Sequence, residues 1–289
     1  MNNLHDPAVI KSILTRHGFT FSKRLGQNFL INPTVCPRIA ELGGARPGCG
    51  VIEIGPGIGV LTNELCKRAD KVVAIELDAR LIPILAETLY EHKNFKVINA
   101  DILDLDLAAL IRDEFKDMPV TVCANLPYYI TSPIVMKLLE SRLPVESITT
   151  MVQREAADRL CAPLGTRDAG AVTVAVDFYS EPKKLFNVSR GSFMPAPQVD
   201  SAVIQLNIRF ETPAVSDEKL FFRIVRGIFT LRRKTILNAL SGSMGIDKSL
   251  AADILAKADI SQTARPEQLT MPQLIALCNA YKTATEVQK

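Results

Sequence analysis

The sequence lacks several features that would place it in a secreted, membrane or metal-binding class. Its six cysteines contain no C-x-x-C pair, which argues against a zinc knuckle and favours reduced, mostly buried thiols. The start, MNNLHDPAVIKSIL, does not show the basic and then apolar pattern of a signal peptide. No apolar run approaches the length needed to cross a bilayer. We therefore expect a cytoplasmic protein that makes no use of a membrane.

The sequence also shows no residues at the spacing of metal ligands and no catalytic-triad motif. The three histidines, His5, His17 and His92, are spread along the chain without ligand spacing. No Ser-His-Asp arrangement is suggested by any motif. We expect surface or packing roles for the histidines and no bound metal.

What the sequence does contain is enough apolar material for a large core. Of its 289 residues, 47% are hydrophobic and 22% are charged, as in a soluble globular protein. The length fits a large domain with a small one. The net charge of +3 is too mild to establish a nucleic-acid partner, so the distribution of basic residues matters more than their sum.

Short strands alternate with helices over the first two thirds of the chain, which predicts βαβ units and a parallel sheet. The expected strands cover residues 50–55, 71–78, 94–101, 119–127, 147–153, 171–179 and 201–210. Helices are expected over 60–69, 79–92, 106–116 and 154–160, and on either side of a basic interruption in the first fifty residues. The fold class is therefore α/β, with a Rossmann-like domain.

A second domain is indicated where the apolar spacing becomes helical throughout, from residue 218 to residue 281. Before it, Thr212-Pro213 ends one element and Ser216-Asp217 can cap the next. We expect a Rossmann-like domain over 1–212 and a small all-α domain over 213–289.

A glycine-rich turn, GPGIG, follows the first predicted strand. Gly55, Gly57 and Gly59 would let the backbone approach a ligand closely. The G-x-G-x-x-G spacing of NAD-binding proteins fails whether it is started at Gly55 or at Gly57. A tight turn needed only for packing is the alternative.

Carboxylates end three consecutive strands. Glu53 lies in the first, Glu76 ends the second, where it can accept from ribose hydroxyls, and Asp101 ends the third, where it can accept from an adenine amino group. In open α/β sheets ligands bind at this edge. An acidic rim suits a cationic nucleoside better than a pyrophosphate, so S-adenosylmethionine and a methyltransferase are favoured over a dinucleotide enzyme.

The fourth strand runs into VCANLPYYI, which places an amide, a proline and two tyrosines beside that ligand. The Asn125 side-chain carbonyl and a backbone carbonyl near Leu126 can hold the N–H groups of an adenine amine and aim its lone pair at the methyl group, while Pro127 stiffens the turn. Tyr128 can stack on the base. The alternative is a strand stop followed by a turn, with Tyr128 and Tyr129 as packing aromatics.

Five segments in order, GQNFL, EIGPGIGVLT, AIELD, NADIL and NLPYYI, closely resemble those of the ribosomal RNA adenine dimethyltransferases. The likeness is greatest to the bacterial small-subunit branch, the KsgA family, and runs from about Leu25 to Arg265. VQREAADRL, SFMPAPQVDSAVI and FTLRRKTILNAL reinforce it. The resemblance implies a class I S-adenosylmethionine-dependent methyltransferase domain.

The resemblance also implies a substrate and site residues. Such enzymes methylate N6 of two adjacent adenines twice each, in a hairpin loop near the 3′ end of 16S rRNA, within a pre-30S subunit; we expect a monomer. The donor site then comprises Asn28, Leu30, Gly55, Gly57, Glu76, Asp101 and Asn125. The target site comprises Asn125, Leu126, Pro127, Tyr128 and Phe193, the last two sandwiching the adenine. One departure is Ala169 in TRDAGAVTV, where the family usually has an aromatic residue.

Basic residues point to RNA contacts. From Lys219 to Gly245 there are six basic residues and no acidic ones. On a helix from residue 219, Lys219, Arg223 and Arg226 share one face, opposite Phe221, Ile224 and Ile228. The predicted RNA-binding residues are Lys23, Arg24, Arg223, Arg226, Arg232, Arg233 and Lys234. The alternative for the helix is an ordinary solvated face.

Two other functions remain open at this stage. One is the large-subunit, macrolide-resistance type of adenine dimethyltransferase, against which NLPYYI and the long helical tail with RRKT argue. The other is an RNA-binding relative that keeps the fold without the chemistry, against which the intact NLPY segment and Glu76 argue.

Overall fold

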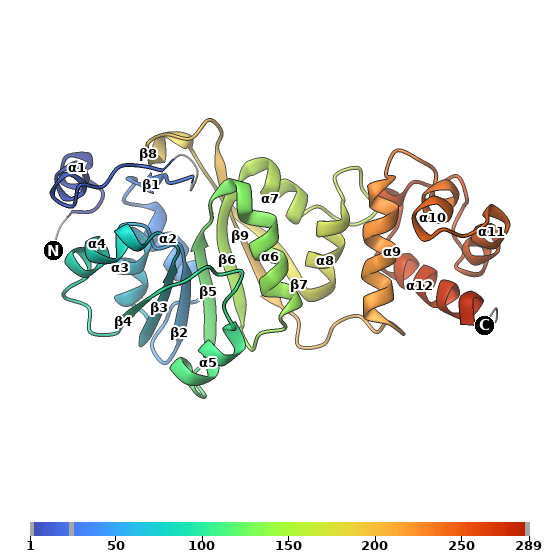
Figure 1. Ribbon diagram of the computed structural model, residues 1–289, viewed down its shortest axis with the longest axis horizontal. Coiled ribbons are helices and arrows are strands. Elements are labelled where there is room, and N and C mark those ends of the chain that lie inside the picture. Colours follow the sequence, from blue (N-terminus) through green and yellow to red (C-terminus); the bar gives the residue numbers. More distant parts are fainter. Residues whose placement is uncertain (1–2, 23–25, 287–289) are drawn as a thin grey trace. The chain divides into compact units, whose positions relative to one another are not determined.

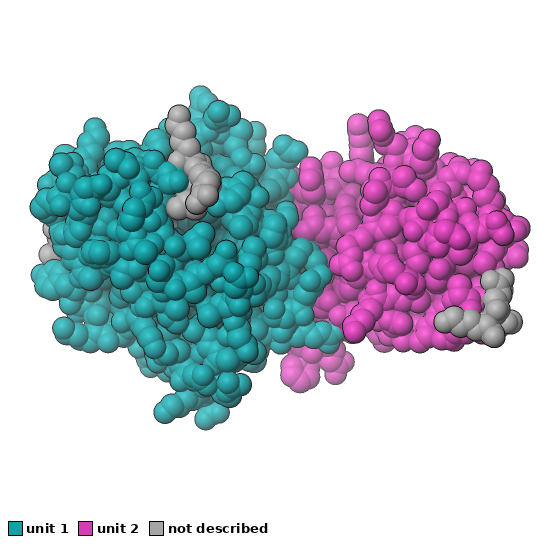
Figure 2. Space-filling view, in the orientation of Figure 1, with its two compact units in different colours: residues 1–157, 181–208 teal, residues 158–180, 209–289 magenta. Residues whose placement is uncertain are grey.

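The computed structural model describes residues 3–22 and 26–286, and the chain divides into two compact units. Unit 1 contains residues 1–157 and 181–208, and unit 2 contains 158–180 and 209–289; Figure 2 shows them in different colours. The domain boundary expected after residue 212 remains a prediction. Unit 2 also takes in residues 158–180, which that boundary assigns to the first domain.

Unit 1 is organised around a seven-stranded sheet in the order β4-β3-β2-β5-β6-β9-β7 (Figure 1). The strands are β2 Gly50–Ile54, β3 Lys71–Glu76, β4 Phe95–Asn99, β5 Val120–Asn125, β6 Ser147–Gln153, β7 Ser180–Val188 and β9 Ser201–Ile208. From β4 to β6 every neighbouring pair is parallel. The chain leaves β2 toward β3 and β4 and returns on the other side to β5, so the order reverses between β2 and β5, which is where ligands bind in such sheets.

Helices precede and connect these strands, since parallel neighbours need a crossover between them. Their bounds are α1 Pro7–Arg16, α2 Val35–Leu42, α3 Val60–Cys66, α4 Ile82–Thr88, α5 Leu107–Phe115, α6 Thr131–Glu140 and α7 Arg154–Leu160. The central strands are buried along their length, because crossovers cover both faces of a parallel sheet. The Rossmann-like α/β fold class predicted from the sequence is confirmed.

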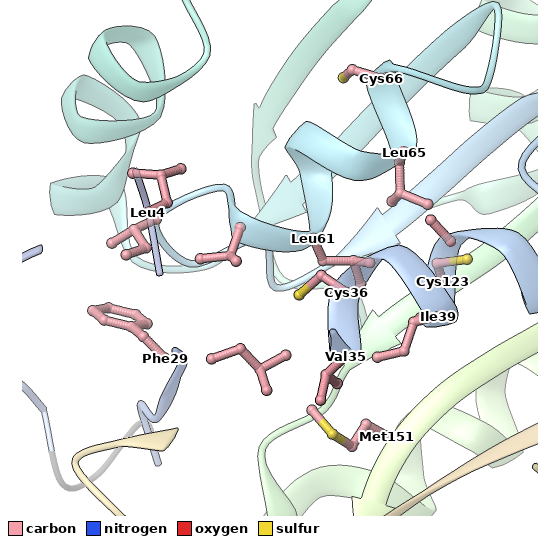
Figure 3. Close-up of a cluster of buried hydrophobic side chains, with 14 of the residues drawn as sticks. Leu4, Phe29, Val35, Cys36, Ile39, Leu61, Leu65, Cys66, Cys123 and Met151 are labelled. Atoms are coloured by element: carbon pink, nitrogen blue, oxygen red, sulfur yellow. The ribbon is translucent and has the colours of Figure 1, made fainter. Parts of the chain in front are cut away.

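A cluster of buried apolar side chains fills one side of the sheet (Figure 3). Cys36 and Ile39 come from α2, and Leu61 and Leu65 from α3. Cys123 joins them from β5. All six cysteines are free, and all but Cys161 are buried. The thiols therefore serve as small apolar groups in this core.

One strand prediction is wrong: residues 171–179 form a helix, α8 Ala171–Tyr179. The segment is rich in β-branched residues, but the Gly170 N–H donates to the Thr173 hydroxyl at 2.9 Å and that hydroxyl donates to the Arg159 carbonyl at 2.8 Å, which fixes a helix start. Residues 173–176 are all buried, so the sequence has no polar face to reveal the helical period. Packing overrides strand propensity here.

The strand that was missed, β7, lies at the edge of the sheet. Its sequence, SEPKKLFNV, contains a proline and two lysines. Proline and lysine are tolerated on edge strands because one side of the strand forms no ladder, and they hide the strand from propensity arguments. Its neighbour β9 is antiparallel to β6, so the last strands depart from the parallel pattern expected for the whole sheet.

Unit 2 is built from helices: α8, α9 Glu218–Thr230, α10 Ile236–Met244, α11 Lys248–Lys257 and α12 Met271–Glu286. Phe178 and Tyr179 of α8 pack against Phe221 and Phe222 of α9 with ring centroids 5.2 to 5.4 Å apart. The all-α character predicted for the C-terminal region is observed. Of the helices within the described residues, none combines the length and the apolar character that crossing a membrane requires.

Candidate active site

A cavity opens at the carboxyl ends of β2, β3, β4 and β5, at the point where the strand order reverses. Every residue predicted for the donor and target sites lines it: Asn28, Leu30, Gly55, Gly57, Glu76, Asp101, Asn125, Leu126, Pro127, Tyr128 and Phe193. The lining also includes Glu53 and, of its described members, none that is basic. The wall is therefore acidic and otherwise largely apolar.

The glycine turn shapes one wall of this cavity. Gly55, Gly57 and Gly59 have φ values of +70°, +61° and +89°, in the left-handed region that side chains other than glycine rarely adopt. A Cβ on Gly57 would lie 3.2 Å from the Phe29 ring. A Cβ on Gly55 would meet no described atom closer than the Asn125 backbone oxygen at 3.9 Å, so glycine keeps that space open.

Glu76 ends β3 at the floor of the cavity and is 6% exposed. One of its carboxylate oxygens accepts from the Asp78 N–H at 2.9 Å, and the other accepts from the Gly57 N–H at 3.3 Å. Burial raises the pKa of Glu76, and these backbone donors oppose the rise. The backbone thus holds the carboxylate in one orientation, with lone pairs still available to a ligand.

Glu53 lies one strand away, on β2, and is 1% exposed. Its Oε2 has no hydrogen-bond partner among the described residues. Burial raises the pKa of Glu53 to about 8, and the nearby charge of Glu76 adds to the rise. A hydrogen bond with Thr62 opposes the rise. A buried oxygen without a partner is costly, so Oε2 is available to a cationic ligand.

Asp101 follows β4, and one of its oxygens accepts from the Leu103 N–H at 2.8 Å. That bond orients the side chain beside the cavity, and the second carboxylate oxygen can accept from a ligand. With Glu53 and Glu76, this places carboxylates at the ends of three neighbouring strands, as the sequence predicts.

Asn125 ends β5 opposite Met151 of β6, and the Leu126 N–H donates to the Met151 carbonyl at 3.2 Å. The Pro127 carbonyl already accepts two hydrogen bonds, from the Ile130 N–H and from the Thr131 hydroxyl, both at 3.2 Å. The Pro127 carbonyl therefore has less capacity left for a ligand, and the assignment of the second acceptor to Leu126 stays a prediction.

The two predicted stacking aromatics reach the cavity from distant parts of the sequence. Tyr128 begins a short 3-10 turn, Tyr128–Ile130, and is half-buried. Phe193 lies in β8 Phe193–Met194, which pairs antiparallel with β1 Phe29–Leu30. Because Phe193 lies opposite Leu30, this small sheet brings the GQNFL and SFMPAP segments together at the cavity.

Sequence reasoning missed a polar network behind the donor side. The Gln27 amide donates to Asp78 at 2.8 Å, and Arg80 binds the same carboxylate through two N–H groups at 2.8 and 2.7 Å. Because Asp78 also donates its N–H to Glu76, the network ties the GQNFL segment to the end of β3. The sequence shows the GQNFL and ELD segments separately. Nothing in it indicates that they lie close together, because their proximity depends on the fold.

The predicted RNA-binding residues fall into different environments. Lys219, Arg223 and Arg226 are exposed on α9, while Phe221, Ile224 and Ile228 of the same helix are buried, as the helical spacing predicts. Lys23 and Arg24 lie outside the described residues.

The basic triplet after α9 is divided. Arg233 and Lys234 are exposed. Arg232 instead donates to the Arg167 carbonyl and lies 3.8 Å from the Glu267 carboxylate. Its guanidinium therefore supports unit 2 internally as well as carrying charge.

Two further expectations concern single positions. Ala169 is 1% exposed and its N–H donates to the Thr166 carbonyl at 3.1 Å, so the departure from the aromatic pattern falls on a packed residue.

His17 lies 2.6 Å from Glu87 and His92 lies 2.9 Å from Asn63. Within the described ranges no three His, Cys, Asp or Glu side chains gather as a metal site would require.

The chain is similar in sequence to known proteins along almost its whole length. The family model described as ribosomal RNA adenine dimethylase matches residues 18–277. Ribosomal RNA small subunit methyltransferase A of Alkaliphilus oremlandii is 47% identical over 282 residues, covering 96% of this chain and 98% of the relative. The protein of the same name from Geobacillus thermodenitrificans is 47% identical over 279 residues, covering 95% of each.

Solved structures agree. A dimethyladenosine transferase from Plasmodium falciparum superposes with a TM-score of 0.73 at 26% identity, covering 89% of this chain and 98% of that one. The 23S rRNA methyltransferase ErmE superposes with a TM-score of 0.67 at 29% identity, covering 88% and 99%. A dimethyladenosine transferase and a 23S rRNA methyltransferase thus share this fold.

Proposed function

The chain belongs to the ribosomal RNA adenine dimethylase family, and we propose that it transfers two methyl groups from S-adenosylmethionine to N6 of each of two adjacent adenines in a hairpin loop near the 3′ end of 16S rRNA. The observation that carries the proposal is the single cavity in which an acidic donor wall meets Asn125, Leu126 and two aromatic residues. The small-subunit relatives at 47% identity favour 16S over 23S rRNA.

The residues present fit the methyl donor. Glu76 would accept from the ribose hydroxyls and Asp101 from the adenine amino group. Backbone N–H groups orient both carboxylates, two of them at Glu76 and one at Asp101. Asn28, Leu30 and the open space at Gly55 complete the predicted donor contacts. When bound, S-adenosylmethionine supplies an electrophilic methyl group on a sulfonium centre. The unpartnered Oε2 of Glu53 suits the positive charge of such a ligand.

The target adenine needs orientation more than it needs a base, because its amine is a weak nucleophile whose lone pair is delocalised into the ring. The Asn125 side-chain oxygen and the Leu126 carbonyl would accept its two N–H groups and favour a pyramidal nitrogen. Tyr128 and Phe193 would hold the ring between them, a contact worth about 1–3 kcal/mol for each stacked base. Holding amine, methyl and sulfur in line lowers the barrier by proximity. The proton is lost as the N–C bond forms.

The partner and setting follow from the same proposal. We assign rRNA binding to the exposed basic residues of α9 and the following triplet, with Lys23 and Arg24 as further contacts, and chemistry to the Rossmann-like domain, with the boundary after residue 212. The substrate is rRNA within a pre-30S particle in the cytoplasm, and the enzyme acts as a monomer.

Mass spectrometry of rRNA from a strain lacking the protein tests the function. Loss of two adjacent dimethyladenines from small-subunit rRNA, restored by the wild-type gene, supports the proposal. Loss from large-subunit rRNA instead would select the type represented by ErmE, and an unchanged pattern together with no heat of donor binding in calorimetry would select a non-catalytic RNA-binding relative.

A further inference from the structure

The start of β9 carries two polar residues, Asp200 and Ser201, that no catalytic role explains. Ser201 is opposite Gln153 of β6 and is fully buried, with 0% exposure. The Arg154 N–H donates to the Asp200 carbonyl at 3.0 Å and closes this end of the ladder. The dipeptide is therefore fixed to the β6–β9 pair by its backbone.

Ser201 reaches the first stacking aromatic. Its hydroxyl and the Tyr128 hydroxyl share a hydrogen bond of 2.7 Å. Tyr128 sits on a short 3-10 turn, which by itself leaves the ring free to change χ1 and to tilt. A bond at the far end of the ring removes that freedom, because the backbone and the hydroxyl are then both held.

Burial raises the pKa of Tyr128, and the charge of Asp200 adds to the rise. The phenol therefore keeps its proton at neutral pH and the bond to Ser201 persists.

Asp200 reaches the segment of the second aromatic. Its Oδ1 accepts from the Arg190 N–H at 3.0 Å, and Oδ2 lies 3.7 Å from the Arg154 guanidinium. Arg190 begins the turn Arg190–Ser192, which leads directly into Phe193. The same turn is also held at its last residue, where the Ser192 carbonyl accepts from the Ile31 N–H at 2.9 Å.

We propose that Asp200 and Ser201 are positioning residues for the target base: Ser201 holds the ring of Tyr128, Asp200 holds the turn that carries Phe193, and together they set the gap between the two aromatic faces. The inference rests on the proposed function, in which those two rings sandwich the adenine. Two adjacent residues, one just before β9 and one at its start, thus hold two rings that come from segments 65 positions apart in the sequence, counting from residue 128 to residue 193.

If the gap between the Tyr128 and Phe193 rings is less well fixed, kcat should fall more than donor affinity, because the proposed donor contacts lie elsewhere in the cavity. Misplacement of a reacting group by a fraction of an ångström slows reactions strongly. We expect Ser201→Ala and Tyr128→Phe each to lower kcat by about tenfold, close to 1.4 kcal/mol.

A double-mutant cycle tests this with small ribosomal subunits purified from a strain lacking the enzyme, S-adenosylmethionine, and full-length protein. The combined variant should be no slower than either single one, since both remove the same bond. Donor affinity by calorimetry should stay within about twofold, and the melting temperature within about 5 °C. Ser147→Ala is the matched control: it removes a buried serine hydroxyl at the opposite end of the same strand pair and should leave kcat unchanged.

Asp200→Ala gives the second arm and should lower kcat by about threefold, because the turn before Phe193 keeps its bonds to residues 31 and 189. The proposal is overturned if Ser201→Ala keeps wild-type kcat, or if the two single effects multiply to about a hundredfold in the combined variant. A wild-type protein that does not methylate small subunits would instead refute the proposed function, and that failure is visible before any variant is compared.

Discussion

The donor side and the target side of the cavity are assembled in different ways. On the donor side, the glycine turn, Glu76 and Asp101 each follow a strand in the same parallel run, so the βαβ repeat alone brings them together. On the target side, Tyr128 and Phe193 come from separated segments, and each is held by its own long-range contact. Phe193 pairs with Leu30 in a two-residue antiparallel ladder, and the Tyr128 hydroxyl bonds that of Ser201. Repetition builds the first side, and individual long-range contacts build the second.

Substituting Asn125 should give the largest effect and isolate the target side. Asn125→Ala removes one of the two proposed acceptors for the substrate amine, and the loss of one preorganised polar group in an active site typically costs about 10²–10³ in kcat. Donor affinity should change by less than about fivefold, since the partners proposed for the donor's ribose and adenine are Glu76 and Asp101.

Methylation of undermethylated small subunits, with calorimetric titration of S-adenosylmethionine in parallel, separates the two effects for Asn125. Near-normal turnover with intact donor binding would remove the amide from the mechanism.

Glu76→Ala should act the other way and isolate the donor side. It removes a carboxylate that the Asp78 and Gly57 N–H groups hold in place, and charge-assisted hydrogen bonds are worth about 1.5–3 kcal/mol. Donor affinity should therefore fall by about 10- to 100-fold, while kcat at saturating donor stays within about threefold. A variant with lost turnover but unchanged donor affinity would show that the two sides are not separable.

The same contrast explains what the sequence could predict. The parallel strands, the acidic strand ends and the NLPY turn are local patterns, and the structure brings those residues into one cavity. The helical face of α9 was also readable from spacing. Helix α8 was not, because most of its residues are buried and its apolar residues show no helical period.

The Ser201–Tyr128 bond and the β1–β8 pair could not be inferred either. A two-residue strand carries no periodic signal, and a hydroxyl contact between distant segments depends on the finished fold. The resemblance marked Phe193 as important without showing what holds it.

The third prediction concerns proton release when the donor binds. Glu53 lies on the donor side of the cavity, and its Oε2 has no hydrogen-bond partner among the described residues. With a pKa of about 8 it is largely protonated at pH 7, and a cationic donor favours the ionised form. Donor binding at pH 7 should therefore release up to about one proton, and donor affinity should rise by up to about fiftyfold between pH 6 and pH 8.

Calorimetry in buffers of different ionisation enthalpy measures the release from Glu53. Glu53→Gln should abolish most of it, and equal release from the variant would assign the proton elsewhere, with Glu76 as the next candidate.

The folding equilibrium gives the opposite sign for the same group. Because the folded-state pKa of Glu53 lies above its ordinary value of 4.5, the folded protein holds more protons between about pH 4.5 and pH 8. Stability without the donor should fall as pH rises through that window. Urea unfolding of wild type and Glu53→Gln at pH 5 and pH 8 checks this: the variant should show the smaller decline, and a parallel decline in both would contradict it.

The smallest effects are expected in unit 2, for the basic triplet Arg232, Arg233 and Lys234. Two of these side chains are exposed, and the third makes contacts within the unit. Arg233 and Lys234 are exposed, so Arg233→Ala and Lys234→Ala should each weaken rRNA binding by only a few-fold and lower the slope of log affinity against log salt by about 0.7–0.9. Arg232→Ala should in addition lower the melting temperature, because its guanidinium contacts Glu267 and the Arg167 carbonyl. Lys257→Ala, an exposed lysine on α11, controls for loss of one charge from the same unit. If all four variants bind rRNA alike across salt, the triplet is part of the fold of unit 2 and the RNA contacts lie elsewhere.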